Sequence, residues 1–322
     1  MYPLIDLSTW EIEEVLNASG SKEKRWYRKP QDNNLALFKL PISLTSSSSI
    51  GESADDLTGE MWSEKISSEI GKVIGIDTHL VDIGYIEAND ESLAYYGARS
   101  EAIYDGKIYG AVCYSFLTEG EDILIEGADM IMEFDPTYAR KKLQGESEVY
   151  SYQLLSRLFE KHDMTNNLYD MIVFDTLIGN TDRHQDNFGI ILNQKNGYIT
   201  FSPLYDNSSS LGREISNKSA TLMMKDSQMF NAYVHGKKSA SLIRWGTIHK
   251  FEKRINTLDL FLKIYTLDPV IKTHLTKITL LTDKILYDII FRIPHEVMSD
   301  QKKAFVFKLI SYRRDYLIKE FL

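Results

Sequence analysis

A run of nine polar or small residues, Gly179 to Asn187, constrains this chain more than any other feature. It lies between a segment of helical periodicity, Asn167 to Ile178, and an apolar run that begins at Phe188. Gly179 stands where a helix commonly ends, because glycine readily adopts the left-handed conformation of a C-cap. A polar loop held between a helix and a strand can position reacting groups. The run is therefore the first candidate for a catalytic loop.

The spacing inside this loop carries a chemical signal. Asp182 precedes Asn187 by five residues, the spacing between the base aspartate and the metal-binding asparagine of kinase catalytic loops. Such chemistry requires a carboxylate that meets the attacking hydroxyl and a neutral oxygen ligand for Mg²⁺ nearby. Because Asp and Asn also form ordinary turns, a purely structural role for the pair stays open.

A hairpin is predicted directly after the loop. Two apolar runs, Phe188 to Leu192 and Tyr198 to Phe201, flank Asn196-Gly197, and Asn-Gly between apolar runs is a strong hairpin signal. If these two residues form the turn, Asn187 faces Asp206 at the open end of the hairpin. An amide oxygen and a carboxylate suit Mg²⁺, with water and a phosphate completing its coordination. The pairing therefore predicts a metal site.

A lysine interrupts a short apolar strand predicted over Leu35 to Leu40. A half-buried Lys39 needs an anionic partner, either nucleotide phosphates or a carboxylate on the next helix. That helix is predicted over Met61 to Ile74, and Glu60 and Glu64 lie one turn apart at its start, so either can pair with the lysine. The alternative is an exposed lysine on a strand edge.

The length and the patterning predict two units, since 322 residues exceed the usual size of one domain. Residues 1–117 read as strands with one helix, and residues 118–322 as a mostly helical unit, so the fold class is α+β. A polar stretch from Ser43 to Thr58, which includes Ser46–Ser49, reads as a mobile surface loop. Further elements are predicted as strands over Leu80 to Ile86 and Lys107 to Leu117, a helix over Val149 to His162, and helices almost throughout from Ile248.

Composition excludes several classes of protein. The net charge of −9 and the pI near 5.4 argue against a general nucleic-acid binder. The single cysteine, Cys113, excludes an internal disulfide and a cysteine-based zinc cluster and fits a reducing cytosol. No apolar run is long enough to span a membrane, and Met1 to Glu14 lacks the basic start of a secretory signal. These features predict a cytoplasmic protein that acts without a membrane.

The order of the motifs resembles the HipA-like serine/threonine protein kinases. This resemblance implies a bilobal protein-kinase-like fold, with a small β-rich N-lobe and a mostly helical C-lobe, that binds ATP in the cleft. Because the chain begins almost at the phosphate loop, it resembles the short, kinase-core type. The resemblance is carried by Asn17 to Lys24, Leu37 to Pro41, Gly59 to Glu64, Asn180 to Gly189 and Ser202 to Asn207.

The resemblance also implies a role for each motif. Asp182 would be the catalytic base, Asn187 and Asp206 would hold Mg²⁺, and Lys39 would contact the ATP phosphates and pair with Glu64. In this family a serine of the phosphate loop can be autophosphorylated, which silences the kinase, and Asn17 stands where other members have serine. The remaining implied positions are Ser19, Gly20 and Ser21 over the phosphates, with Ser19 and Ser21 as autophosphorylation candidates, and Ser115 and Phe116 in an adenine-binding hinge from Tyr114 to Leu117.

Two residues of the catalytic loop have less defined roles. His184 matches the family run and either orders the loop through a hydrogen bond or takes part in the chemistry. Asp186 is interpreted as a solvated loop carboxylate. Both assignments depend on the tertiary structure.

The implied function is a Mg·ATP-dependent kinase that phosphorylates itself and a cytosolic protein, for which an aminoacyl-tRNA synthetase is a candidate by analogy. The family also implies the toxin of a toxin–antitoxin pair, with a HipB-like antitoxin supplying any DNA binding. Action as an exported effector stays open.

Three alternatives remain. The Asp-Arg-His-x-x-Asn run is also similar to that of phosphatidylinositol-type lipid kinases, with Lys237-Lys238 and Arg313-Arg314 as basic residues for a membrane surface. The second alternative is a pseudokinase that binds nucleotide without transferring phosphate. Such a protein would not need the retained residues Lys39, Asp182, Asn187 and Asp206. A metal-dependent phosphohydrolase using Asp182, His184 and Asp206 would release free phosphate.

Overall fold

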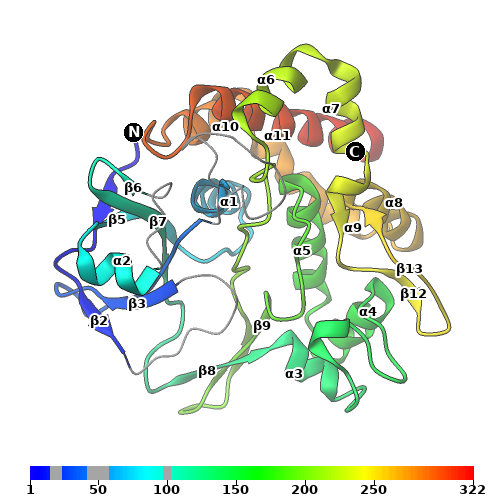
Figure 1. Ribbon diagram of the computed structural model, residues 1–322. Coiled ribbons are helices and arrows are strands. Elements are labelled where there is room, and N and C mark those ends of the chain that lie inside the picture. The colour runs from blue at the N-terminus through cyan, green and yellow to red at the C-terminus, as the bar shows by residue number, and fades with distance from the viewer. Residues whose placement is uncertain (15–23, 42–57, 97–102) are drawn as a thin grey trace.

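A twisted sheet forms the N-terminal part of the molecule, and helices form most of the remainder (Figure 1). The computed structural model describes residues 1–14, 24–41, 58–96 and 103–322. Within these ranges, seven strands form one sheet in the order β1-β5-β7-β4-β3-β2, with β6 paired to β7. These strands are β1 (Leu4–Asp6), β2 (Glu11–Glu13), β3 (Lys24–Arg28), β4 (Leu35–Lys39), β5 (Val81–Glu87), β6 (Ile103–Tyr104) and β7 (Lys107–Tyr114).

Three smaller sheets belong to the C-terminal part of the described chain. The first has the order β10-β9-β8, and the other two pair β11 with β14 and β12 with β13. Their strands are β8 (Asp122–Glu126), β9 (Gly189–Asn193), β10 (Ile199–Phe201), β11 (Ala240–Ser241), β12 (Trp245–Thr247), β13 (Lys250–Glu252) and β14 (Ile255–Asn256).

The helices lie mostly after residue 126. Within the described ranges, two precede it, α1 (Glu60–Ile74) and α2 (Asp90–Tyr96). The others are α3 (Gly127–Met132), η3 (Arg140–Lys142), α4 (Tyr152–Lys161), α5 (Thr165–Ile178), α6 (Asn217–Lys225), α7 (Ser227–Val234), η4 (Lys237–Ser239), α8 (Thr257–Leu267), α9 (Ile271–Leu275), η5 (Thr276–Leu280), α10 (Asp283–Phe291) and α11 (Asp300–Phe321).

The alternation of side chains along the central strands separates two apolar cores. On β4, Phe38 packs into a core that also contains Tyr96 of α2, whereas Leu37 packs against the core on the side of α1. Because successive side chains of a strand point to opposite faces, Lys39 lies on the same face as Leu37. Leu37 pairs with Cys113 of β7, which also belongs to the core on the α1 side. Strand periodicity thus directs Lys39 and Cys113 toward α1.

Helix α1 lies between the sheet and the C-terminal helices (Figure 1). It contacts β5 and β7 on one side and α10 and η5 on another. Trp62, Ile66 and Ile70 are fully or almost fully buried. Packing against the sheet and against the C-terminal helices therefore holds α1 in place. This position allows α1 to connect the lysine strand to the segment that follows the predicted catalytic hairpin.

Helix α5 ends at the glycine that the sequence identified as its cap. Gly179 has φ 67° in the left-handed region, and its backbone N–H donates to the carbonyl of Asp175. Arg313 of α11 donates to the carbonyl of Thr176 at 2.9 Å and lies against the cap. The start of the polar loop is thereby held by both the helix cap and α11.

Replacement of Gly179 by alanine is expected to lower the free energy of unfolding by about 2–3 kcal/mol. Alanine is strained in the left-handed region, and its side chain would be forced against Arg313. An added Cβ would lie 3.0 Å from Arg313 Cζ. Gly75 is a matched control, because it caps α1 with φ 66° and its Cβ would meet nothing within 4 Å. Urea denaturation of both variants measures the difference, and Gly75→Ala should lose only about 1 kcal/mol. Equal losses would show that the contact with Arg313 is unimportant.

The predicted hairpin is present, but its predicted register is wrong. Ile199 pairs with Leu192 and Phe201 with Ile190, so the pairing differs by two residues from the one that set Asn187 opposite Asp206. The turn is longer because the Asn193 side chain accepts hydrogen bonds from the backbone of Lys195 and Asn196. Four residues, rather than Asn-Gly alone, therefore lie between the paired positions Asn193 and Tyr198.

Other local predictions need smaller corrections. The segment from Ile248 to Asn256 is not helical but contains β13 and β14, and the strand predicted to reach Leu117 ends at Tyr114. Helix α2 was not predicted. Ser46–Ser49 and most of the stretch around it lie outside the described residues.

The predicted α+β class is confirmed by the strand-rich beginning and the helical remainder of the described chain. The boundary at residues 117 and 118 stays a prediction. In the described ranges, no helix combines the length and the apolar character needed to cross a membrane.

Candidate active site

The polar loop after α5 is wound into a compact turn that brings its two predicted functional residues together. The side-chain Nδ2 of Asn187 donates to the carbonyl of Asp182 at 2.9 Å. The N–H of Asp182 donates to Asn180 Oδ1 at 3.0 Å, and that of His184 to the carbonyl of Asp182 at 2.8 Å. Because the amide nitrogen of Asn187 is committed to the loop, its amide oxygen faces away from that carbonyl. The five residues from Asp182 to Asn187 therefore form one turn, which the hydrogen bond from the Asn187 side chain to the Asp182 carbonyl closes.

Arg183 is the centre of the site. Its side chain is 1% exposed and forms a two-point ion pair with Asp175 of α5, at 2.9 Å from Nε and 2.8 Å from Nη2. The Nη1 atom donates to the carbonyls of Asn187 and Tyr205, at 2.9 and 2.8 Å. Burial by itself lowers the pKa of Arg183, but Asp175 outweighs it and raises the pKa above its ordinary value. One permanent cation thus joins the polar loop to the segment that contains Asp206.

Lys39 connects the sheet to the same segment. Its Nζ lies 3.2 Å from Glu64 Oε1 and 3.4 Å from Asp206 Oδ1. Burial alone lowers the pKa of Lys39, but the two carboxylates outweigh it and hold the pKa well above its usual value. Of the two acids at the start of the helix, the structure places Glu64, the one that the family resemblance implied, beside the lysine, whereas Glu60 pairs with Arg213. A charged lysine is therefore fixed next to Asp206.

Helix α1 also holds the backbone around Asp206. Glu64 Oε2 accepts a hydrogen bond from the N–H of Asn207 at 3.1 Å. Ser63 donates to the carbonyls of Asn207 and Ser210 at 3.3 and 3.0 Å. Asn207 accepts from Arg183 through its side-chain oxygen at 2.6 Å. The segment after β10 is consequently tied to α1 and to the polar loop at once.

Asp206 has an unusual backbone conformation, with φ 53° in the left-handed region. A non-glycine residue in this region carries strain that the surrounding contacts must hold. Its Oδ1 atom accepts from Ser208 at 3.0 Å. Asn187 and Asp206 offer oxygen ligands of the kind that Mg²⁺ takes, and Arg183 bridges the backbone carbonyls of Asn187 and of Tyr205, the residue before Asp206. The donor set is thus suitable for Mg²⁺, although the hairpin register does not pair the two residues.

The predicted adenine hinge follows β7. Ser115 donates its N–H to the carbonyl of Leu35 at 2.7 Å, and Leu117 donates to Ser115 Oγ at 3.2 Å. Phe116 packs against Tyr205, with ring centroids 5.4 Å apart. Because Tyr205 directly precedes Asp206, this contact brings the predicted hinge close to the predicted metal ligand.

His184 and Asp186 both take part in the structure of the loop. The Nδ1 of His184 accepts from the N–H of Asp186 at 3.1 Å, which fits the predicted ordering role. Asp186 is not simply solvated, since Arg140 donates to it at 2.9 Å and also pairs with Glu126 and Asp129.

Some predicted site residues cannot be placed, and some important ones were missed. Ser19, Gly20 and Ser21 lie outside the described residues. Sequence reasoning missed Asp175, which lies eight residues before Arg183 and is the single charged residue in the largely apolar second half of α5, Met171 to Ile178. It also missed His79, which lies 3.7 Å from Glu64 and had no motif around it.

Comparisons with known proteins identify the family of the chain and its fold. A family model described as the HipA-like C-terminal domain matches residues 16–259. The solved structure of the Helicobacter pylori proinflammatory kinase CtkA is similar, with a TM-score of 0.75 and 18% identity over 98% of this chain and 96% of that chain. HipA of Shewanella oneidensis MR-1, solved with HipB and operator DNA, gives a TM-score of 0.36 and 13% identity over 94% of this chain and 69% of that chain. No curated protein sequence matches the chain.

The likeness to CtkA, at this level of identity, establishes the fold, and the family model covers well over half of the chain. On these grounds the chain belongs to the HipA-like kinase family and has a protein-kinase fold.

Proposed function

We propose that the protein is a Mg·ATP-dependent serine/threonine protein kinase. The observation that carries this proposal is the position of Lys39 between Glu64 and Asp206. In protein kinases a strand lysine paired with a helix glutamate contacts phosphates, and a nearby aspartate holds the metal. The family match and the kinase fold support the same conclusion.

In the proposed reaction, Asp182 accepts the proton of a serine or threonine hydroxyl. The hydroxyl oxygen forms a bond to the γ-phosphorus, and the bond to the bridging oxygen of ADP breaks. Asn187 and Asp206 would hold Mg²⁺, which neutralises phosphate charge when bound. Lys39 orients the phosphates, Ser115 and Phe116 flank the adenine, and Arg183 keeps the loop and the Asp206 segment in register.

Incubation of the protein with Mg²⁺ and γ-labelled ATP is expected to transfer label to serine or threonine residues of the protein itself. Mass spectrometry locates the label, and we expect it on Ser19 or Ser21. Chelation of Mg²⁺ and the Asp206→Asn variant should each reduce labelling at least a hundredfold, because charge stabilisation at the phosphates is lost. Asp288→Asn is a control, since Asp288 pairs only with exposed Lys284 in the described contacts. Release of free phosphate without protein labelling would instead favour the phosphohydrolase.

We further propose a toxin role in a toxin–antitoxin pair, with a cytosolic protein as substrate. Membership of the HipA-like family supports this role, and the net charge of −9 supports leaving DNA contacts to a partner. Expression of the wild-type protein should arrest bacterial growth, and the Asp206→Asn variant should not.

A further inference from the structure

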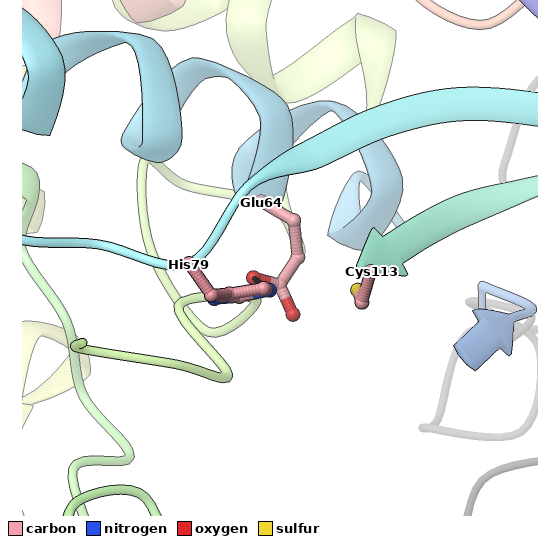
Figure 2. Close-up of side chains that lie close together, drawn as sticks. All are labelled: Glu64, His79 and Cys113. Atoms are coloured by element: carbon pink, nitrogen blue, oxygen red, sulfur yellow. Dashed lines mark ion pairs between the residues drawn. The ribbon is translucent and has the colours of Figure 1, made fainter. Parts of the chain in front are cut away.

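Three chemically reactive side chains, Glu64, His79 and Cys113, lie close together (Figure 2), and the first of them is the partner of Lys39. Glu64 comes from α1, His79 from the segment before β5, and Cys113 from the end of β7. Their potential ligand atoms all lie within 4.8 Å of one another, and the residues are 1%, 4% and 6% exposed. Among the described residues this is a closely spaced group of carboxylate, imidazole and thiol, of which the proposed phosphoryl transfer uses only Glu64.

The hydrogen bonding of His79 directs a nitrogen lone pair into this group. Its Nδ1 lies 3.3 Å from the carbonyl oxygen of Leu204. A carbonyl can only accept a hydrogen bond, so Nδ1 carries the proton of the neutral ring and Nε2 presents its lone pair. Nε2 lies 3.7 Å from Glu64 Oε2. Burial lowers the pKa of His79, which favours the neutral ring. The lone pair of Nε2 therefore faces a buried carboxylate whose Oε1 pairs with Lys39 and whose Oε2 accepts from the N–H of Asn207, and a cation bound there would take both side chains as ligands.

The chemistry of the donors selects the cation. Zn²⁺ binds carboxylate oxygen, imidazole nitrogen and thiolate sulfur, whereas Mg²⁺ prefers oxygen ligands alone. Three protein ligands leave a fourth position open, as in many zinc sites. The carboxylate and a thiolate together neutralise the two positive charges, once the thiol proton of Cys113 has passed to solvent. The hydrogen bond from His79 Nδ1 to a carbonyl is the outer contact that zinc-binding histidines commonly make.

We propose that Glu64, His79 and Cys113 form a Zn²⁺ site whose occupation removes Glu64 from Lys39 and thereby inhibits the kinase. The inhibitory half rests on the proposed function. Lys39 already occupies one side of the Glu64 carboxylate at 3.2 Å, and an ammonium beside a divalent cation is repelled. Asp206, at 3.4 Å from Lys39, is the partner that the lysine retains. Zn²⁺ and Lys39 therefore compete for Glu64.

The site is tested with Co²⁺ on the full chain, because a cobalt–thiolate bond gives a charge-transfer band in the near ultraviolet. We expect the wild-type protein to bind one Co²⁺ with this band and Zn²⁺ to displace it. Cys113→Ser should abolish the band, and His79→Gln should weaken binding at least tenfold. His249→Gln, at an exposed position outside the group, should bind as the wild type does. Absence of the band in the wild-type protein would overturn the site without requiring any variant to fold.

The competition has a separate readout that does not depend on phosphoryl transfer. Lys39→Met should bind Co²⁺ and Zn²⁺ more tightly than the wild-type protein, at least tenfold, because the competing ammonium is gone. Unchanged affinity would refute the competition. If the wild-type protein labels itself as proposed, Zn²⁺ should inhibit the labelling, and Cys113→Ser should need at least tenfold more Zn²⁺. A protein that binds Co²⁺ as expected but never transfers label would contradict the kinase and leave the metal site standing.

Discussion

The Asp182→Asn variant should transfer phosphate at least a hundredfold more slowly than the wild-type protein, within the range of about 10²–10⁴ that a general base contributes. Asparagine has nearly the same shape but cannot accept the hydroxyl proton. The loop should persist, because it is held by the backbone N–H and carbonyl of Asp182, at 3.0 and 2.9 Å from Asn180 and Asn187. Single-turnover transfer of label measures the rate, and nucleotide titration measures ATP affinity, which should change less than about threefold.

Asp186→Asn is the control within the same loop. Asp186 pairs with Arg140, which is 40% exposed and also contacts Glu126 and Asp129. Loss of one partner from such an exposed group has a small energetic effect, so the transfer rate should stay within about fivefold of the wild-type rate. If the Asp182→Asn variant keeps a tenth of the wild-type rate or more, the base is another group.

The largest effect on stability is expected from Asp175→Asn. Arg183 is almost completely buried, and Asp175 is the carboxylate that pairs with it at two points. Removal of one partner from a buried pair leaves an uncompensated charge, which costs about 3–5 kcal/mol. Urea denaturation should show this decrease in the free energy of unfolding. Because Arg183 also holds the carbonyls of Asn187 and Tyr205, phosphoryl transfer should fall even where the variant remains folded.

Asp129→Asn is the matched control for this prediction. Asp129 also pairs with an arginine, Arg140, but its side chain is 44% exposed. An exposed ion pair contributes about 0–1 kcal/mol, so this variant should unfold nearly as the wild-type protein does. Similar losses in the Asp175→Asn and Asp129→Asn variants would contradict the central role of the buried pair.

Local patterns were sufficient to predict much of the candidate site. The helix end at Gly179 and the strand that carries Lys39 follow from periodicity and from the conformational preference of glycine, which act over a few residues. The same patterns narrowed the partner of Lys39 to Glu60 or Glu64. They could not choose between these acids, because the choice depends on how α1 is rotated against β5 and β7, and tertiary packing sets that rotation.

The hairpin shows where local reasoning failed. Asn196-Gly197 correctly indicated a turn, but the side chain of Asn193 lengthened it and shifted the register by two residues. The conclusion that Asp206 approaches the polar loop nevertheless holds, for a different reason. Arg183 donates to the carbonyls of Asn187 and Tyr205, and no pairing rule along the strands reveals such a bridge.

The sequence by itself determined which residue types are present and their order along the chain: a lysine on an apolar strand, acids on the next helix, and a polar loop before a hairpin. Tertiary structure alone decided that Arg183 is the buried centre and that His79 and Cys113 lie beside Glu64. The reason is physical. Propensity and periodicity act between near neighbours in the chain, whereas burial and charge pairing act between residues that only folding brings together.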